Sequence, residues 1–131
     1  MIRSSVRFFF LATAISVAIF FGGPTHAQPF AGGTGTISDP YQISTPVHLY
    51  NIRENLSAHY IQINDIDLNV APFNEGYGWT PIGNSSMKFM GSFNGQGFTI
   101  SNMYMDRTNN DYCGLFGYIT SLAVIKNTCL I

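Results

Sequence analysis

A six-residue pattern that occurs three times restricts the folds open to this 131-residue chain. The pattern begins with Ile, has Asn or Asp third and Leu or Met sixth, and covers residues 63–68, 100–105 and 125–130. The apolar residues favour short strands, and Asn or Asp favours a corner because both tolerate left-handed backbone. Recurrence after 37 and 25 residues predicts an all-β fold of stacked coils, an incomplete right-handed parallel β-solenoid similar to a β-helix.

The polar third position of each match is expected to mark one corner of this stack. In this interpretation Asp65, Asn102 and Asn127 lie above one another in a single turn column, and the apolar positions line up inside the coils. The alternative is that a β-rich chain repeats the pattern by chance and folds as an ordinary sandwich of two sheets.

The stretch 89–105 combines the second match with a glycine-rich turn. Asn94-Gly95 and Gly97 adopt positive φ at little cost, so they predict a tight turn. Residues 98–100 are aromatic or β-branched and predict a strand. A tight turn therefore leads directly into a strand.

A set of glycines and apolar residues carries a resemblance to a known family. Its members are Phe89, Gly91, Phe93, Gly95, Gly97, Ile100 and Asn102, followed by Gly114, Leu115, Phe116 and Gly117. In this order they resemble the GLUG repeats of bacterial surface proteins, and residues 30–41, 64–68 and 79–83 resemble segments that commonly precede such repeats. The resemblance covers almost all of the chain after residue 29. It implies a secreted or surface-attached β-solenoid, and it implies no reaction and no catalytic residue.

Residues 1–27 are predicted to be a secretory signal peptide. Two arginines come first, residues 8–21 are apolar, and Ala27 is a small residue before the expected cleavage site at Gln28. An uncleaved membrane anchor is the alternative, but about 14 apolar residues are fewer than the roughly 20 that span a bilayer. Cleavage implies export to the extracellular space, the cell surface or the periplasm.

Residues 28–131 are expected to form one modest GLUG-like β-solenoid domain. They carry four basic side chains against seven acidic ones, a formal net charge of −3. The basic residues are scattered, so we expect no nucleic-acid partner, and no membrane contact after signal cleavage. We expect the last coil to end without a cap, which predicts a domain truncated at its C-terminus.

One short capping helix is predicted over residues 46–56. Thr45 is a suitable N-cap, and Pro46 suits the first helical position. Leu49 and Ile52 begin an apolar stripe at helical spacing. We expect this stripe to cover the first coil, because an open solenoid end exposes strand edges and apolar interior.

The long segment 69–88 carries three aromatic residues, Phe73, Tyr77 and Trp79. Exposed rings on a loop could stack on a sugar. The simpler interpretation is that these rings pack over the flank of the stack.

No catalytic residue, cofactor or metal site is predicted. Asp65, Asp67 and Asn69 imitate the start of a calcium loop, but the sixth and twelfth positions of that loop are Val70 and Gly76 here. An irregular calcium site remains an alternative. The two aspartates also share strand parity and could act as paired carboxylates on a glycoside. Turn capping is the simpler interpretation of both.

Cys113 and Cys129 are the only cysteines and lie 16 residues apart. Export would permit a disulfide between them. The alternative, which we favour, is a pair of buried thiols, with Cys113 inside the fold beside residues 114–117.

These features predict a secreted or cell-surface structural module, adhesin-like and without catalytic activity. The expected partners are further repeats of the same protein, host or matrix ligands, or a second copy that self-associates through the open C-terminal coil. The alternative is a fragment of a β-helical polysaccharide-processing enzyme or of a surface metallopeptidase, since GLUG-like repeats also occur in non-catalytic regions of metallopeptidases that cleave immunoglobulin A. A cluster of charged side chains on one exposed face would favour the enzyme.

Overall fold

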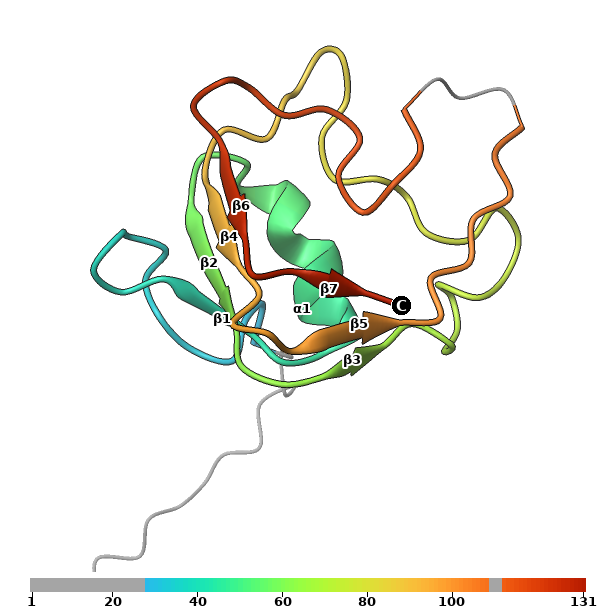
Figure 1. Ribbon diagram of the computed structural model, residues 1–131, viewed down its shortest axis with the longest axis horizontal. Helices are drawn as coiled ribbons and strands as arrows, with labels where there is room; N and C mark the ends of the chain where they lie inside the picture. Colours follow the sequence, from blue (N-terminus) through green and yellow to red (C-terminus); the bar gives the residue numbers. More distant parts are fainter. Residues whose placement is uncertain (1–27, 109–111) are drawn as a thin grey trace, which may run out of the picture.

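The fold is built on two parallel β-sheets. This computed structural model describes residues 28–108 and 112–131. Sheet A has the order β1-β2-β4-β6, and sheet B has the order β3-β5-β7 (Figure 1). The strands of sheet A are β1 Tyr41–Ile43, β2 His59–Gln62, β4 Ser92–Asn94 and β6 Val124–Lys126, and those of sheet B are β3 Ile66–Asp67, β5 Thr99–Ser101 and β7 Cys129–Leu130. The all-β expectation is confirmed. The expected signal peptide lies outside the described residues.

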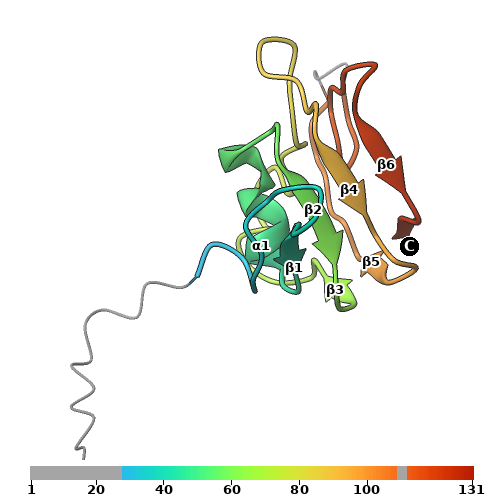
Figure 2. The same ribbon diagram turned by 90° about the vertical axis from the view of Figure 1, so that its left-hand side faces the viewer.

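From β2 onward, each pass of the chain through the two sheets contributes one strand to each of them, whereas the first pass contributes β1 to sheet A alone. β2 is followed by β3, β4 by β5, and β6 by β7, so that strands of successive passes lie side by side (Figure 2). The rest of the pass also pairs in parallel, through isolated bridges from Ile82 to Phe116 and from Phe89 to Ile119. Neighbouring passes are thus in contact along two sheets and along this third side.

The register of the two sheets places the large apolar residues on their inner faces. In sheet A, Tyr60 is aligned with Phe93, and Phe93 with Ile125. In sheet B, Ile66 is aligned with Ile100. Side chains alternate between the faces of a strand, and Phe93, Ile66 and Ile100 are almost completely buried. The core therefore lies between the two sheets.

The single turn column expected from the repeated pattern is wrong. Ile100 pairs with Ile66 of sheet B, whereas Ile125 pairs with Phe93 of sheet A. The two matches therefore begin in different sheets, and their third residues, Asn102 and Asn127, occupy different corners. The left-handed backbone expected at both is confirmed, with φ of 56° and 52°. Two corners of one coil have the same backbone requirement, so residue type alone does not distinguish them.

Side-chain hydrogen bonds join adjacent passes at the corner of Asn127 and at the corner of Asn102. The Asn127 side-chain amide donates to Asn94 Oδ1 at 3.1 Å. At the other end of sheet B, the Asn102 amide donates to Asp67 Oδ1 at 2.9 Å. Polar corner residues thus join neighbouring passes, although they do so at two corners and not one.

The predicted helix is present and lies at the β1 end of the stack (Figure 2). It consists of α1, Pro46–Asn51, and the 3-10 turn η1, Ile52–Glu54. Thr45 caps it by accepting a hydrogen bond from the His48 N–H at 3.1 Å. Leu49 within it is fully buried. The helix ends two residues earlier than predicted, and its last turn is 3-10.

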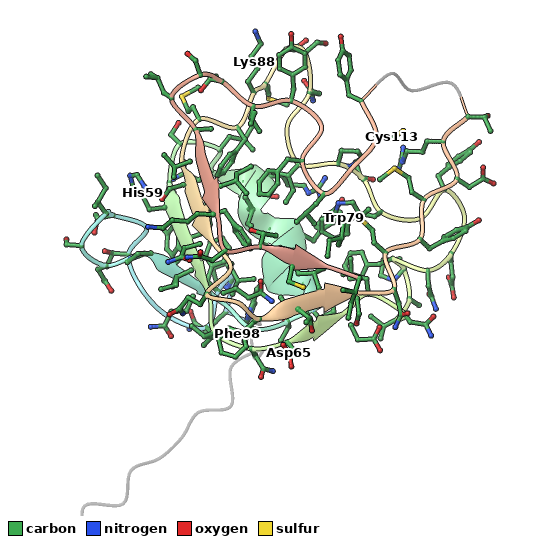
Figure 3. All side chains as sticks on the ribbon, in the orientation of Figure 1. His59, Asp65, Trp79, Lys88, Phe98 and Cys113 are labelled. Carbon is green, nitrogen blue, oxygen red and sulfur yellow. The ribbon has the colours of Figure 1, made fainter. Side chains whose placement is uncertain are left out.

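The aromatic segment 69–88 packs against the stack. Trp79 is fully buried and points into the molecule (Figure 3), and its indole N–H donates to the Leu115 carbonyl oxygen at 3.2 Å. Phe73 is also buried, with its ring 5.6 Å from that of Trp79. The packing interpretation is therefore confirmed for these two rings. Tyr77 differs, since 72% of it is exposed.

Candidate functional site: the open edge of the stack

The segment 114–117 pairs with the preceding pass of the chain. The Ile82 N–H donates to the Leu115 carbonyl, and the Gly117 N–H donates to the Ile82 carbonyl, both at 2.9 Å. The segments 79–83 and 114–117, which the sequence separates by thirty residues, are therefore neighbours in the stack.

The two middle residues of the segment 114–117, Leu115 and Phe116, pack in the core. Leu115 is buried, and the Phe116 ring lies 4.9 Å from the ring of Phe89 and 5.7 Å from that of Phe93. Phe89 and Phe93 are both fully buried. The motif residues from the two segments thus pack against each other between adjacent passes.

Three motif glycines lie where a side chain would meet the backbone of another pass. A Cβ on Gly91 would collide with the Ala58 carbonyl oxygen, and a Cβ on Gly95 would collide with the Asn127 carbonyl oxygen. A Cβ on Gly117 would lie 2.7 Å from the Gly83 carbonyl oxygen. Close approach between passes, and not positive φ, is what requires glycine at these three positions.

The stack is open beyond β6 and β7. No described strand pairs with the outer edge of either, since both sheets end there. Leu130 of β7 is aligned with the fully buried Ile100, yet 45% of it is exposed. Val124 of β6 is half exposed, and Ile131 is 71% exposed. Leu130, an inner-face residue, is thus left uncovered together with two neighbouring apolar residues. The edge formed by β6 and β7 is therefore the candidate interaction surface.

A polar hollow lies at the corner next to this edge. Its volume is about 450 Å³, and its lining consists of Asn94, Gln96, Gly97, Asn127, Thr128 and Cys129. The φ of Gly97 is 80°, and its N–H donates to the Asn127 carbonyl oxygen at 3.0 Å. Gly97 therefore fulfils the expectation of a positive-φ turn residue.

The two cysteines are both exposed, so the expectation of two buried thiols is wrong. Leu130 faces the core, and alternation along β7 turns its neighbour Cys129 outward. Near Cys113, Leu115 takes the interior position. The Cys113 thiol lies 3.9 Å from the Arg107 carbonyl oxygen. Cys113 and Cys129, both among the described residues, are not joined by a disulfide.

Asp65 and Asp67 bond to the backbone and side chains around their turns. Asp65 Oδ1 accepts the Thr99 N–H at 2.8 Å, and Asp67 Oδ1 accepts the Asn69 N–H at 2.9 Å. The Asn102 amide and then the Asn69 N–H lower the pKa of Asp67. The bond from Asn69 to Asp67 fits the turn-capping interpretation, whereas Asp65 joins its turn to the neighbouring pass. Within the described ranges, no group of three or more His, Cys, Asp or Glu side chains is placed to hold a metal ion.

The structure also brings together a histidine and a serine that sequence patterns did not indicate. His59 of β2 is aligned with Ser92 of β4, and His59 Nδ1 lies 2.7 Å from Ser92 Oγ. His59 lies on the outer side of sheet A (Figure 3). A serine nucleophile also needs a group that orients the imidazole and donors for an oxyanion. No carboxylate among the described residues bonds to His59, so the pair is a cross-strand contact.

A second group missed by the sequence patterns contains Arg53, Thr80 and Arg107. Both guanidinium groups donate to Thr80. The residues come from three different passes, and no short motif joins them, so only the folded chain shows their proximity.

Two relatives match most of this chain. A protein of Evansella cellulosilytica named as a Gly-rich membrane protein is 39% identical over an alignment of 110 residues, which covers 82% of this chain and 13% of that protein. Halomucin of Haloquadratum walsbyi is 36% identical over an alignment of 107 residues, which covers 75% of this chain and 1% of that protein. The chain thus spans a small part of these curated relatives.

Other comparisons add no family. No protein-family model matches the chain, and no solved structure matches it. In residues 28–108 and 112–131, no helix is long and apolar enough to cross a membrane.

Proposed function

We propose that this chain is a secreted or cell-surface structural module, a GLUG-like right-handed β-solenoid without catalytic activity. Its role in this proposal is architectural: it presents coils that stack on one another. The pairing of segments 79–83 and 114–117 supports the family resemblance, because it gives the order of the motifs a physical reason. Two relatives whose names are a Gly-rich membrane protein and halomucin are in keeping with a surface setting.

The observation that carries the proposal is the uncovered edge of β6 and β7. A parallel stack of this kind buries its inner residues only where a further pass covers them. The buried Ile100 and the exposed Leu130 occupy equivalent positions in successive passes. An apolar strand edge of this type pairs readily with another strand.

We infer that residues 28–131, taken by themselves, cover this edge with a second copy of the same segment. The argument is one of exposure, since Leu130 is uncovered and no described strand pairs with the outer edges of β6 and β7. Two identical edges related by a two-fold axis pair antiparallel. The opposite end of the stack carries the helix α1, so within residues 28–131 the edge of β6 and β7 is the one available for pairing. Such an interface buries Val124, Leu130 and Ile131.

The test is the oligomeric state of residues 28–131, measured by size-exclusion chromatography with light scattering over a range of concentrations. We expect a dimer that dissociates on dilution. Leu130→Glu places a charge on the edge and should give a monomer. The matched control is Leu122→Glu, because Leu122 is 81% exposed and lies outside the strands. A wild-type protein that stays monomeric at high concentration contradicts the proposed occupant.

A further inference from the structure

Arg53, Arg107 and Thr80 form a group of converging polar side chains away from the open edge. Arg53 belongs to η1, and Arg107 follows β5 by six residues. Arg53 Nη2 donates to the Thr80 carbonyl oxygen at 2.9 Å, and Arg107 Nη2 donates to Thr80 Oγ1 at 2.8 Å. Two guanidinium groups from distant segments are therefore held on the two oxygen atoms of one residue.

Further contacts fix the orientation of both guanidinium groups. Arg53 lies over the Tyr50 ring at 3.7 Å, and its Nε donates to the Tyr50 carbonyl oxygen at 2.6 Å. Arg107 Nε donates to the carbonyl oxygen of Trp79 at 3.1 Å. Each group thus uses two donors on neutral oxygens and keeps others of its five N–H bonds for a ligand. Groups fixed in this way lose little conformational entropy on binding.

Among the described residues, no carboxylate neutralises the charge of this pair. No described carboxylate forms a salt bridge with Arg53 or Arg107. Burial, and then repulsion by Arg107, lower the pKa of Arg53. Four basic residues occur after residue 27, and two of them meet here. Their repulsion is relieved when an anion binds between them.

Aromatic rings flank the pair and indicate the kind of anion. Tyr77 is 72% exposed, and Arg107 lies 5.9 Å from the centre of its ring. Tyr50, beneath Arg53, is 37% exposed. An exposed tyrosine ring beside a cation suits a ligand with an apolar face and an anionic substituent, and the ring of an acidic sugar has both.

We propose that Arg53, Arg107 and Tyr77 form a binding site for an acidic sugar of a polysaccharide. The sugar's carboxylate or sulfate accepts hydrogen bonds from the two guanidinium groups, and its ring packs on Tyr77. This site lies away from β6 and β7, so it is independent of the pairing proposed above. Two arginines without a partner carboxylate suit binding and provide no acid–base pair for cleavage.

Affinity electrophoresis of the exported protein in native gels tests this site. The gels contain polygalacturonate, dextran sulfate or uncharged dextran, so that carboxylate and sulfate ligands are compared directly. We expect retardation by at least one acidic polymer and none by dextran, despite the net negative charge of the protein. Arg107→Gln should weaken binding by about tenfold or more, and Tyr77→Ala should weaken it as well.

Lys88→Gln is the matched control, because it removes one positive charge elsewhere and should change binding by less than about twofold. Arg107→Lys keeps the charge but not the planar fork, and it should bind more weakly than wild type even if Arg107→Gln is unstable. An absence of retardation by both acidic polymers would overturn the site. An equal loss in Lys88→Gln and Arg107→Gln would also overturn it, and an unchanged Tyr77→Ala would refute the contact with the sugar ring.

Discussion

Replacement of Asn102 by Leu tests the corner at the end of sheet B. Asn102 has a φ of 56°, and a left-handed backbone costs an ordinary residue about 1–2 kcal/mol. The change also removes the hydrogen bond from the Asn102 amide to Asp67. We therefore expect the free energy of unfolding to fall by about 1–2 kcal/mol from the backbone term alone.

The assay is urea denaturation of residues 28–131 followed by circular dichroism, in which this loss lowers the midpoint by about 1 M. Asn102→Gly separates the two contributions, because glycine accepts the left-handed backbone but lacks the amide. It should be less destabilising than Asn102→Leu. An unchanged midpoint for Asn102→Leu, or equal losses in both variants, would refute the assignment of a strained corner.

The remaining predictions concern the close contacts, the pH dependence and the N-terminus. Gly117→Val should destabilise the fold by about 1–3 kcal/mol through overpacking and should lower the urea midpoint more than Tyr118→Ala. A larger loss in Tyr118→Ala would show that the segment 114–117 is not the packing element described here. The folded-state pKa of Asp67 is lowered from 3.8, so its contribution to stability is complete above that value and is lost as the pH falls below it. The stability difference between wild type and Asp67→Asn should therefore shrink in acid, and a constant difference would contradict this. Intact mass of the exported protein should show cleavage between Ala27 and Gln28, whereas a retained N-terminus would contradict export by a cleaved signal.

The helix was predictable because its signals are local. The Thr45 cap and Pro46 are adjacent in sequence, and Leu49 lies within one turn of them. The end of the helix was placed too late, since the backbone tightens into η1 beyond Asn51. Short-range signals of this kind depend little on the rest of the fold.

The register of the stack was not predictable in the same way. Asn102 and Asn127 both have positive φ, so the pattern correctly identifies corners, but it does not say which corner each one occupies. That choice depends on the length of chain between strands and on which inner residues fill the core, such as Ile66 beside Ile100. The Arg53–Arg107 pair likewise results from the long-range arrangement of passes, and no local pattern indicates it.

The parallel register of successive passes is the central claim, and engineered disulfides test it most directly. Ser92 and Val124 are aligned on adjacent strands of sheet A, a separation that a disulfide can bridge. In a background with both native cysteines replaced by serine, Ser92→Cys with Val124→Cys should form a disulfide under mild oxidation and resist alkylation. Asn102→Cys with Asn127→Cys should remain reduced, because these residues occupy different corners. Bonding of the second pair and not the first would contradict the stack described here and support a single turn column.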